Sequence, residues 1–165
     1  MNKSDTKTKT NPHEWFDDPD PTGETDTGES GLRFSCTQCG GCCTGPTGFV
    51  LFTDAEAKAM AKDLGITSDA FYERYTRDTI VGRSLKETKT SFGYDCVFLD
   101  RDDQGKALCT IYNTRPEQCR TWPFWKSNLE SQDDWDEAAQ DCPGMNTGTL
   151  YSTTHIRITR DRVEI

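Results

Sequence analysis

The chain has 165 residues, of which 33% are hydrophobic and 28% charged, and its 28 acidic and 19 basic residues give a net charge of −9. This length suits one domain, the apolar run at 49–52 is too short for a membrane helix, and residues 1–10 lack the apolar stretch of a secretory signal. We therefore expect a cytoplasmic protein that does not span a membrane and does not bind nucleic acid, since phosphate backbones repel an acidic chain.

Residues 1–31 have the composition of a disordered segment. Trp15 and Phe16 are among its few apolar side chains, and eight acidic and three basic residues give it a charge of −5. So little apolar surface does not offset the entropy lost on ordering. We expect a disordered acidic tail over 1–31 and one folded domain over 32–165 with a charge of −4. Both aromatic side chains are expected to be undocked, the alternative being that they dock on the domain or on a partner.

The first half of the domain predicts one strand and two helices. Residues 49–52 (FVLF) are typical of a short buried strand. The capping box Thr53-Asp-Ala-Glu56 predicts the start of a helix over about 54–64. Ser68 is expected to cap a second helix, over about 69–77.

The second half predicts a β-hairpin and short helices. Residues 94–99 and 107–112 flank the polar turn 100–105, which indicates a hairpin. Further elements are expected over about 114–120 (a helix), 131–140 (a helix) and 150–165 (a strand or a helix). The expected fold is therefore a small, irregular α+β domain.

All eight cysteines lie in this domain, and four of them fall within eight residues. The sequence Cys36-Thr-Gln-Cys39-Gly-Gly-Cys42-Cys43 forms the cluster. The other four cysteines are widely spaced: Cys96, Cys109, Cys119 and Cys142. The two histidines, His13 and His155, have no ligand-like spacing and are not expected to bind metal.

Three explanations compete for the cysteines. Disulfides suit a secreted domain, but the expected compartment and the tight spacing of the cluster disfavour them. A narrower version is a redox-active pair of Cys36 and Cys39. Buried structural thiols would explain Cys96 or Cys109 alone, but not a cluster interrupted by two glycines.

Metal chelation is the third explanation and the best one. A Cys-x-x-Cys-x-x-Cys run supplies three thiolates to one site, and glycines allow the left-handed backbone that such a loop needs. Soft thiolates select zinc, iron–sulfur clusters or Cu(I) over hard ions. The pattern thus favours a metal-nucleated domain without identifying the metal.

Charge predicts further site residues. Eight thiolates and two divalent ions would leave a charge of about −4, so cationic side chains and amide donors are needed near the sulfurs. Arg115 and Arg120 flank Cys119 and are the candidates for this role, although each could equally form an ordinary surface ion pair.

Several ordered motifs resemble a known family. They are Phe34-x-Cys36-x-x-Cys39-Gly-x-Cys42-Cys43, Cys96-Val-Phe-Leu99 and Cys109-Thr-Ile-Tyr112-x-x-Arg115-Pro116-x-x-Cys119-Arg120-x-x-Pro123-Phe124. Over residues 32–145 the chain resembles the CxxCxxCC cysteine-cluster family of YkgJ-like zinc- or iron-chelating proteins, which includes relatives of flagellin N-methylase. Cys142 looks like the family's trailing cysteine. The resemblance implies one metal-binding region assembled from all eight cysteines.

Two functions follow as expectations. The first is a metal-binding protein that holds zinc or an iron–sulfur centre, with a protein as its partner if the metal serves only to stabilise a binding module. The second is an enzyme that uses the same centre for redox chemistry or protein modification. Methylase activity is not carried over, since the chain shows no glycine-rich S-adenosylmethionine loop after a strand.

Overall fold

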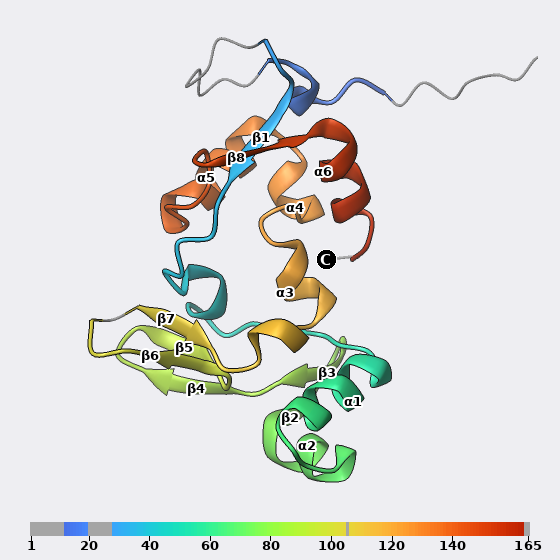
Figure 1. Ribbon diagram of the computed structural model, residues 1–165, viewed down its shortest axis with the longest axis vertical. Coiled ribbons are helices and arrows are strands. Elements are labelled where there is room, and N and C mark those ends of the chain that lie inside the picture. The colour runs from blue at the N-terminus through green and yellow to red at the C-terminus, as the bar shows by residue number, and fades with distance from the viewer. Residues whose placement is uncertain (1–11, 20–27, 105, 164–165) are drawn as a thin grey trace, which may run out of the picture.

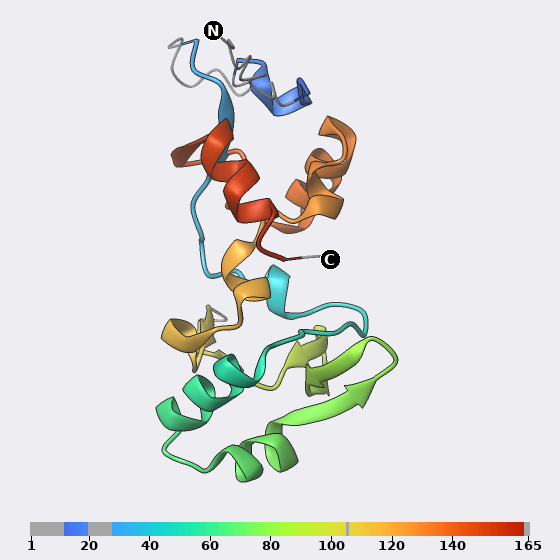
Figure 2. The ribbon, with the colours of Figure 1, turned by 90° about the vertical axis from the view of Figure 1, so that its right-hand side faces the viewer.

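The computed structural model describes residues 12–19, 28–104 and 106–163 and has the expected α+β composition. Its elements form two lobes, each built around its own hydrophobic cluster (Figures 1 and 2). The helix α3 (Glu117–Thr121) and the cysteine-rich segment 36–43 lie between these lobes. The cysteines of the cluster are therefore placed where the two halves of the molecule meet.

The upper lobe combines one strand pair with three helices. Strand β1 (Gly31–Phe34) pairs antiparallel with β8 (Thr149–Ser152). The helices are α4 (Lys126–Leu129), α5 (Gln132–Asp141) and α6 (Thr153–Arg160). The buried residues of its cluster are Phe16, Leu32, Phe124, Leu129, Trp135, Cys142, Met145 and Ile156.

Helix starts in this lobe follow ordinary capping chemistry. Ser131 accepts a hydrogen bond from the Asp134 amide at 3.2 Å and begins α5, as expected for the helix over 131–140. Ser152 accepts one from the His155 amide at 3.3 Å and begins α6. The ambiguous segment 150–165 thus contains both elements, because a capping residue ends the strand and starts the helix.

Part of the expected disordered tail is packed against the upper lobe. In the 3-10 helix η1 (Trp15–Asp17), Phe16 is only 1% exposed, and the Trp15 indole donates to the Leu129 carbonyl at 3.0 Å. Asp17 pairs with Arg157 at 2.5 Å. The prediction of undocked aromatic residues was therefore wrong, because two aromatic rings and an ion pair stabilise this short segment. Residues 1–11 and 20–27 of the predicted tail lie outside the described residues.

The lower lobe combines two helices with three hairpins. Helices α1 (Asp54–Asp63) and α2 (Ser68–Tyr75) precede them. The hairpins are β2 (Thr76–Thr79) with β3 (Gly82–Leu85), β4 (Glu87–Thr90) with β5 (Gly93–Cys96), and β6 (Leu99–Arg101) with β7 (Ala107–Cys109). The buried residues of its cluster are Ala57, Met60, Ala61, Phe71, Leu85, Phe98 and Ile111.

The predicted helices of this lobe are confirmed, with one shifted cap. The capping box of α1 is present: Thr53 Oγ1 accepts from the Glu56 amide at 3.2 Å, and Glu56 accepts from the Thr53 amide at 2.7 Å. Helix α2 begins one residue earlier than expected, because Thr67 rather than Ser68 accepts from the Ala70 amide. Pro116 immediately precedes α3, consistent with the predicted short helix over 114–120.

The predicted strands were less accurate. The run 49–52 is not a strand: Leu51 forms an isolated bridge to Ser84, and Phe49 is 44% exposed. The predicted strand 94–99 is divided, since its first part belongs to β5 and pairs with β4, whereas Leu99 starts β6. Only the short β6–β7 hairpin corresponds to the expected one.

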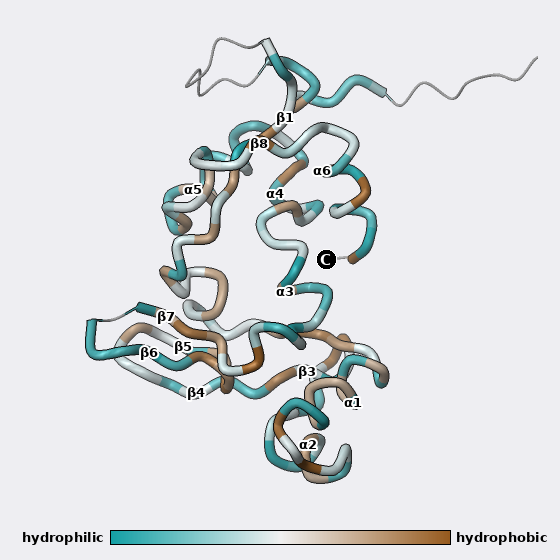
Figure 3. Tube along the Cα trace, viewed as in Figure 1, coloured by the Kyte–Doolittle hydropathy of each residue, from teal (hydrophilic) through white to brown (hydrophobic). Residues whose placement is uncertain are grey.

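Apolar residues occur along the trace as short stretches between polar ones (Figure 3). Among the described residues, none of the helices combines the length and apolar character that crossing a membrane requires.

Candidate metal centre

The cysteine-rich segment turns through a left-handed glycine into the 3-10 helix η2 (Gly41–Cys43). Gly40 has φ +80°, and a Cβ at this position would lie 2.7 Å from Ala107 Cβ. The Cys43 amide donates to the Gly40 carbonyl at 2.9 Å, which closes the turn. Only glycine fits this combination of backbone conformation and close approach, as the Gly-Gly pair predicted.

Contacts with the upper lobe bring the start of this segment to Cys142. The Ser35 amide, next to Cys36, donates to the Gly144 carbonyl at 3.0 Å. Gly41 packs so closely on the turn after α5 that a Cβ there would lie 2.5 Å from the Asp141 carbonyl oxygen. Residues more than 100 positions apart are thus held together by backbone contacts.

Contacts with the lower lobe hold the end of the segment on β5 and β7. The Ala107 amide donates to the Gln38 carbonyl at 2.9 Å. Thr44 Oγ1 donates to Asp95, which is 7% exposed, and Arg101 Nη2 lies 3.4 Å from the same carboxylate oxygen. Burial raises the pKa of Asp95, but the hydrogen bonds from Thr44 and Arg101 outweigh burial and hold it below the usual value. Asp95 therefore links the cysteine segment to the β6–β7 hairpin as a carboxylate.

Five cysteines from four segments line one cavity of about 30 Å³: Cys42, Cys43, Cys96, Cys109 and Cys119. A neighbouring cavity of about 40 Å³ is lined by Cys36, Cys42, Cys43 and Cys109. All eight cysteines are free, so the disulfide explanation has no support here. The tertiary fold gathers thiols that are up to 77 positions apart in sequence around one cavity.

The sulfurs surround these cavities without forming a finished chelate. Cys42 Sγ and Cys43 Sγ lie 3.6 Å apart, within hydrogen-bonding distance for sulfur. Within the part of the chain that the structure describes, no three cysteine, histidine, aspartate or glutamate side chains are already arranged to hold a metal ion. The donor chemistry suits a soft metal, and binding would require thiol side chains to move toward the ion.

Backbone amides are directed at four of the eight sulfurs, each from the residue two positions further along. The Gly41 amide donates to Cys39 Sγ at 3.4 Å. Burial raises the pKa of Cys96, Cys109 and Cys142, and hydrogen bonds from the amides of Phe98, Ile111 and Gly144 offset part of this rise. Such N–H groups stabilise sulfur in its negatively charged form, which is the form that binds metal.

A protein-family comparison covers this same region. The CxxCxxCC model, described as "Putative zinc- or iron-chelating domain", matches residues 35–143, about two thirds of the chain, including all eight cysteines. The chain belongs to the CxxCxxCC family. It is thereby a metal-binding domain of the cysteine-cluster type. No solved structure matches the chain.

Burial favours the protonated form of four thiols of the CxxCxxCC domain. It raises the pKa of Cys96 to about 11 and that of Cys119 to about 12, and it also raises those of Cys109 and Cys142. A hydrogen bond from the Cys43 thiol lowers the pKa of Cys42 to about 7 and raises that of Cys43. Metal binding must therefore release protons, because thiolates are the ligands.

Of the two predicted arginines, only Arg115 lies with the thiols of the CxxCxxCC domain. It lines both small cavities, and its charge lowers the pKa of Cys42, Cys109 and Cys119. Its guanidinium carbon lies 3.7 Å from the centre of the Tyr112 ring. Arg120 instead pairs with Glu117 at 2.5 Å and lies 3.7 Å from Glu56. The structure thus places Arg120 in the surface ion pair that was its alternative explanation.

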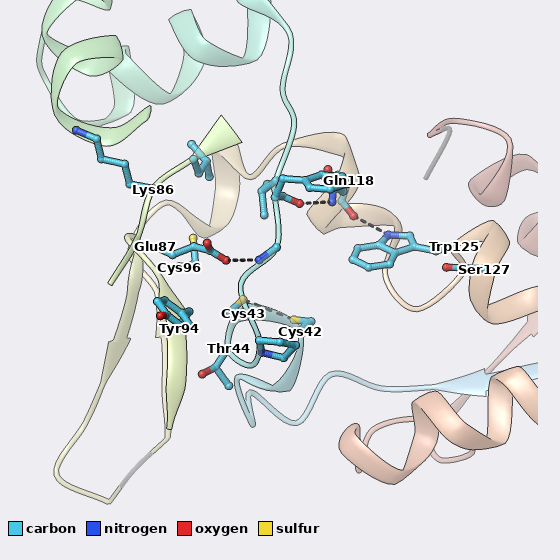
Figure 4. A pocket seen from close by; sticks show the side chains of 15 residues that line it. Cys42, Cys43, Thr44, Lys86, Glu87, Tyr94, Cys96, Gln118, Trp125 and Ser127 are labelled. Atoms are coloured by element: carbon cyan, nitrogen blue, oxygen red, sulfur yellow. Dashed lines mark hydrogen bonds between the residues drawn. The ribbon is translucent and has the colours of Figure 1, made fainter. Parts of the chain in front are cut away.

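A larger cavity of about 340 Å³ opens beside the thiols of the CxxCxxCC domain (Figure 4). Tyr94 and Cys96 lie on one side, and Gln118 and Trp125 lie on the other. Gln118 holds one wall in place: its side chain donates to the Phe49 carbonyl at 3.0 Å and accepts from the Leu51 amide at 2.8 Å. Sequence reasoning missed Gln118, because nothing near it in the chain signals partners 67 and 69 positions away.

The aromatic residues near Cys119 in the sequence lie in different surroundings. Trp122 and Trp125 line the five-cysteine cavity, and the Trp122 indole donates to Cys142 Sγ at 3.5 Å. Phe124 belongs to the upper hydrophobic cluster, and Tyr112 is 47% exposed. Of the histidines, His13 contacts Asp17 and Asp18, and the His155 ring packs on Tyr151 with centroids 4.8 Å apart.

Proposed function

We propose that this chain binds zinc or iron through thiolates supplied by its eight cysteines, and that the bound metal joins its two lobes. The observation that carries this proposal is the cavity of about 30 Å³ lined by five cysteines. A water molecule needs about 10–15 Å³ of such space, so an ion and the sulfurs drawn toward it can be accommodated. The metal would supply strong bonds between segments that few other contacts connect.

The surroundings of the thiols support a bound cation. The described residues that line the two small cavities include several thiols but no histidine or carboxylate. Such a donor set is typical of structural zinc and of iron–sulfur clusters. Arg115 supplies a compensating positive charge, and the four backbone amides stabilise the thiolates. Each of these features serves a negatively charged sulfur and would be of little use to a neutral thiol in a hydrophobic core.

The position of the cysteines supports a structural role for the metal. Cys142 belongs to the upper hydrophobic cluster, whereas Cys96 and Cys109 pack against the lower one. Cys119 lies on α3, between the lobes. An ion held by these side chains would therefore cross-link two cores, and folding should be coupled to metal binding.

The test is anaerobic purification followed by metal analysis and absorption spectroscopy. Stoichiometric zinc in a colourless protein, or iron with sulfide and broad absorption near about 400 nm, would support the proposal and identify the metal. Removing the metal with the thiols kept reduced should abolish much of the near-UV circular dichroism, and re-adding the metal should restore it. A fully reduced protein that binds neither metal, with an unchanged spectrum, would refute the proposal.

The larger cavity favours an enzyme as a second candidate function. It reaches Cys42, Cys43 and Cys96, so a ligand inside it would meet the metal centre from the side. Catalytic zinc keeps one coordination position open, whereas structural sites are closed by four protein ligands. On this alternative the centre serves redox chemistry or an N-methylase-like protein modification. Azide added to cobalt-loaded protein should alter the cobalt spectrum if a position is open, and an unchanged spectrum would exclude this alternative.

A further inference from the structure

Trp122 contacts two parts of the thiol region at once. It directly follows α3, three positions beyond Cys119. Its ring lines the cavity of about 30 Å³ that five cysteines share, Cys119 among them. Its indole N–H donates to the sulfur of a further cysteine, Cys142, at 3.5 Å, and Cys142 is not among the described residues that line this cavity. Trp122 therefore connects the cavity with a thiol that belongs to the upper lobe.

Sulfur is an unusual partner for a tryptophan in this chain. The other three tryptophans donate to oxygen: Trp15 to the Leu129 carbonyl at 3.0 Å, Trp125 to the Gln118 carbonyl at 2.9 Å, and Trp135 to Asn146 Oδ1 at 2.7 Å. A neutral thiol is a weak acceptor, whereas a thiolate accepts a strong, charge-assisted hydrogen bond. The contact therefore gains most of its strength when Cys142 carries the negative charge that metal binding requires.

A second tryptophan holds the Trp122 ring in this orientation. The ring of Trp125 meets that of Trp122 edge to face, with centroids 4.8 Å apart and an interplanar angle of 82°. Trp125 is itself fixed to α3, because its indole N–H donates to the Gln118 carbonyl at 2.9 Å and lies 3.2 Å from Thr121 Oγ1. The direction of the Trp122 N–H is thus set by the helix that carries Cys119.

We propose that Trp122 is a positioning residue of the metal centre: its indole N–H holds Cys142 Sγ and stabilises this sulfur as a metal-bound thiolate. The inference rests on the proposed metal-binding function and extends the centre beyond its cysteines. Because Trp122 adjoins α3 and Cys142 is part of the upper cluster, the same hydrogen bond ties a thiol of the upper lobe to the helix of Cys119.

This hydrogen bond should affect both the affinity and the electronic structure of the bound metal. Partners that hydrogen-bond to metal ligands typically contribute about 10–100-fold to metal affinity. An N–H donor also withdraws electron density from a thiolate, so its loss lowers the energy needed to move charge from sulfur to metal. Lost packing can produce the first effect, whereas the second requires the hydrogen bond.

Trp122→Phe in the full, reduced chain, loaded with cobalt, tests the inference. Phenylalanine keeps an aromatic ring but lacks the N–H. The sulfur-to-cobalt charge-transfer band should move to lower energy than in the wild-type protein. Cobalt affinity, measured by competition with a chelator, should fall by about 10-fold or more.

Trp135→Phe is the matched control. Trp135 is 1% exposed in the upper lobe, and this variant also removes an indole hydrogen bond, but the partner is Asn146 Oδ1 rather than sulfur. The control should lose stability and keep the wild-type band energy.

An unchanged band in Trp122→Phe, with or without weaker binding, would overturn the inference and leave the proposed function intact. No cobalt or zinc binding by the wild-type chain would refute both. If Trp122→Phe does not fold, NMR of the wild-type chain loaded with NMR-active cadmium decides. The Trp122 Nε1–H resonance should then show scalar coupling to cadmium across the hydrogen bond, and an uncoupled resonance would overturn the inference.

Discussion

Phe16 provides the sharpest test of how the N-terminal segment is held. Replacing it by alanine removes a side chain that is 1% exposed, belongs to the upper hydrophobic cluster and contacts the Trp15 ring with centroids 5.6 Å apart. The guanidinium of Arg157 also lies 5.2 Å from the centre of the Phe16 ring. A disordered tail would make none of these contacts.

The expected cost follows from this burial. Truncating a fully buried phenylalanine costs about 3–5 kcal/mol, since both transfer free energy and packing are lost. For a chain of this size, that corresponds to a fall in Tm of about 10 °C. Thermal unfolding of metal-loaded Phe16→Ala and wild-type protein, followed by circular dichroism, measures it.

The control is Ile80→Ala, because Ile80 is fully exposed and should change the free energy of unfolding by less than about 0.5 kcal/mol. If Phe16→Ala matched this control, the N-terminal segment would not be packed in solution, and the composition-based expectation of an undocked tail would be correct.

Three further predictions concern the links around the site. Asp95→Asn should lower the free energy of unfolding by about 2 kcal/mol and weaken zinc binding, because a buried carboxylate that holds Thr44 is lost. A zinc affinity equal to that of the wild-type protein in a competition assay would contradict this. The hydrogen bond from Arg157 lowers the pKa of Asp17 below 3.8, so this pair stabilises the fold above that pH and ceases to do so as pH falls through the lowered value. Asp17→Asn should thus be about 1 kcal/mol less stable than wild type at pH 7, and the difference should vanish at acidic pH in denaturant titrations. Gly40→Ala should lower the free energy of unfolding by about 1–3 kcal/mol and reduce zinc affinity. Gly65→Ala is the control: Gly65 is also left-handed but has open space around it, so this variant should lose stability without losing zinc affinity. Identical zinc affinity in both variants would refute a role for Gly40 in the centre.

Local signals in the sequence predicted the helices well. The capping box at Thr53 needs only four consecutive residues, so it could be recognised without knowledge of the fold. The sequence predicted Ser68 as the N-cap of α2, one residue after the observed cap Thr67, because adjacent Thr and Ser side chains can both accept the capping hydrogen bond. The cysteine motif likewise indicated the type of site, since donor type and spacing are properties of the sequence itself.

The strand prediction at 49–52 failed for a physical reason. A strand needs successive backbone pairs, but here the bridge between Leu51 and Ser84 is isolated and side chains supply other partners: Ser84 Oγ accepts from the Val50 amide at 2.9 Å, and Gln118 contacts Phe49 and Leu51. A run of four apolar residues carries no information about such partners.

Long-range contacts also explain what was missed in the site. Arg115 and Arg120 both flank Cys119 in the sequence, yet only Arg115 lines the thiol cavities. Glu56, on another helix, lies close to Arg120, and no local pattern predicts that proximity. Similarly, the amino-acid composition of residues 1–31 could not show that Phe16 packs into the hydrophobic cluster of the upper lobe.

X-ray absorption at the metal edge tests the central claim most directly. If cysteine thiolates hold the metal, the nearest shell should consist of about four sulfur atoms, at about 2.3 Å for zinc. A shell dominated by nitrogen or oxygen at about 2.0–2.1 Å would contradict metal binding by the cysteine cluster.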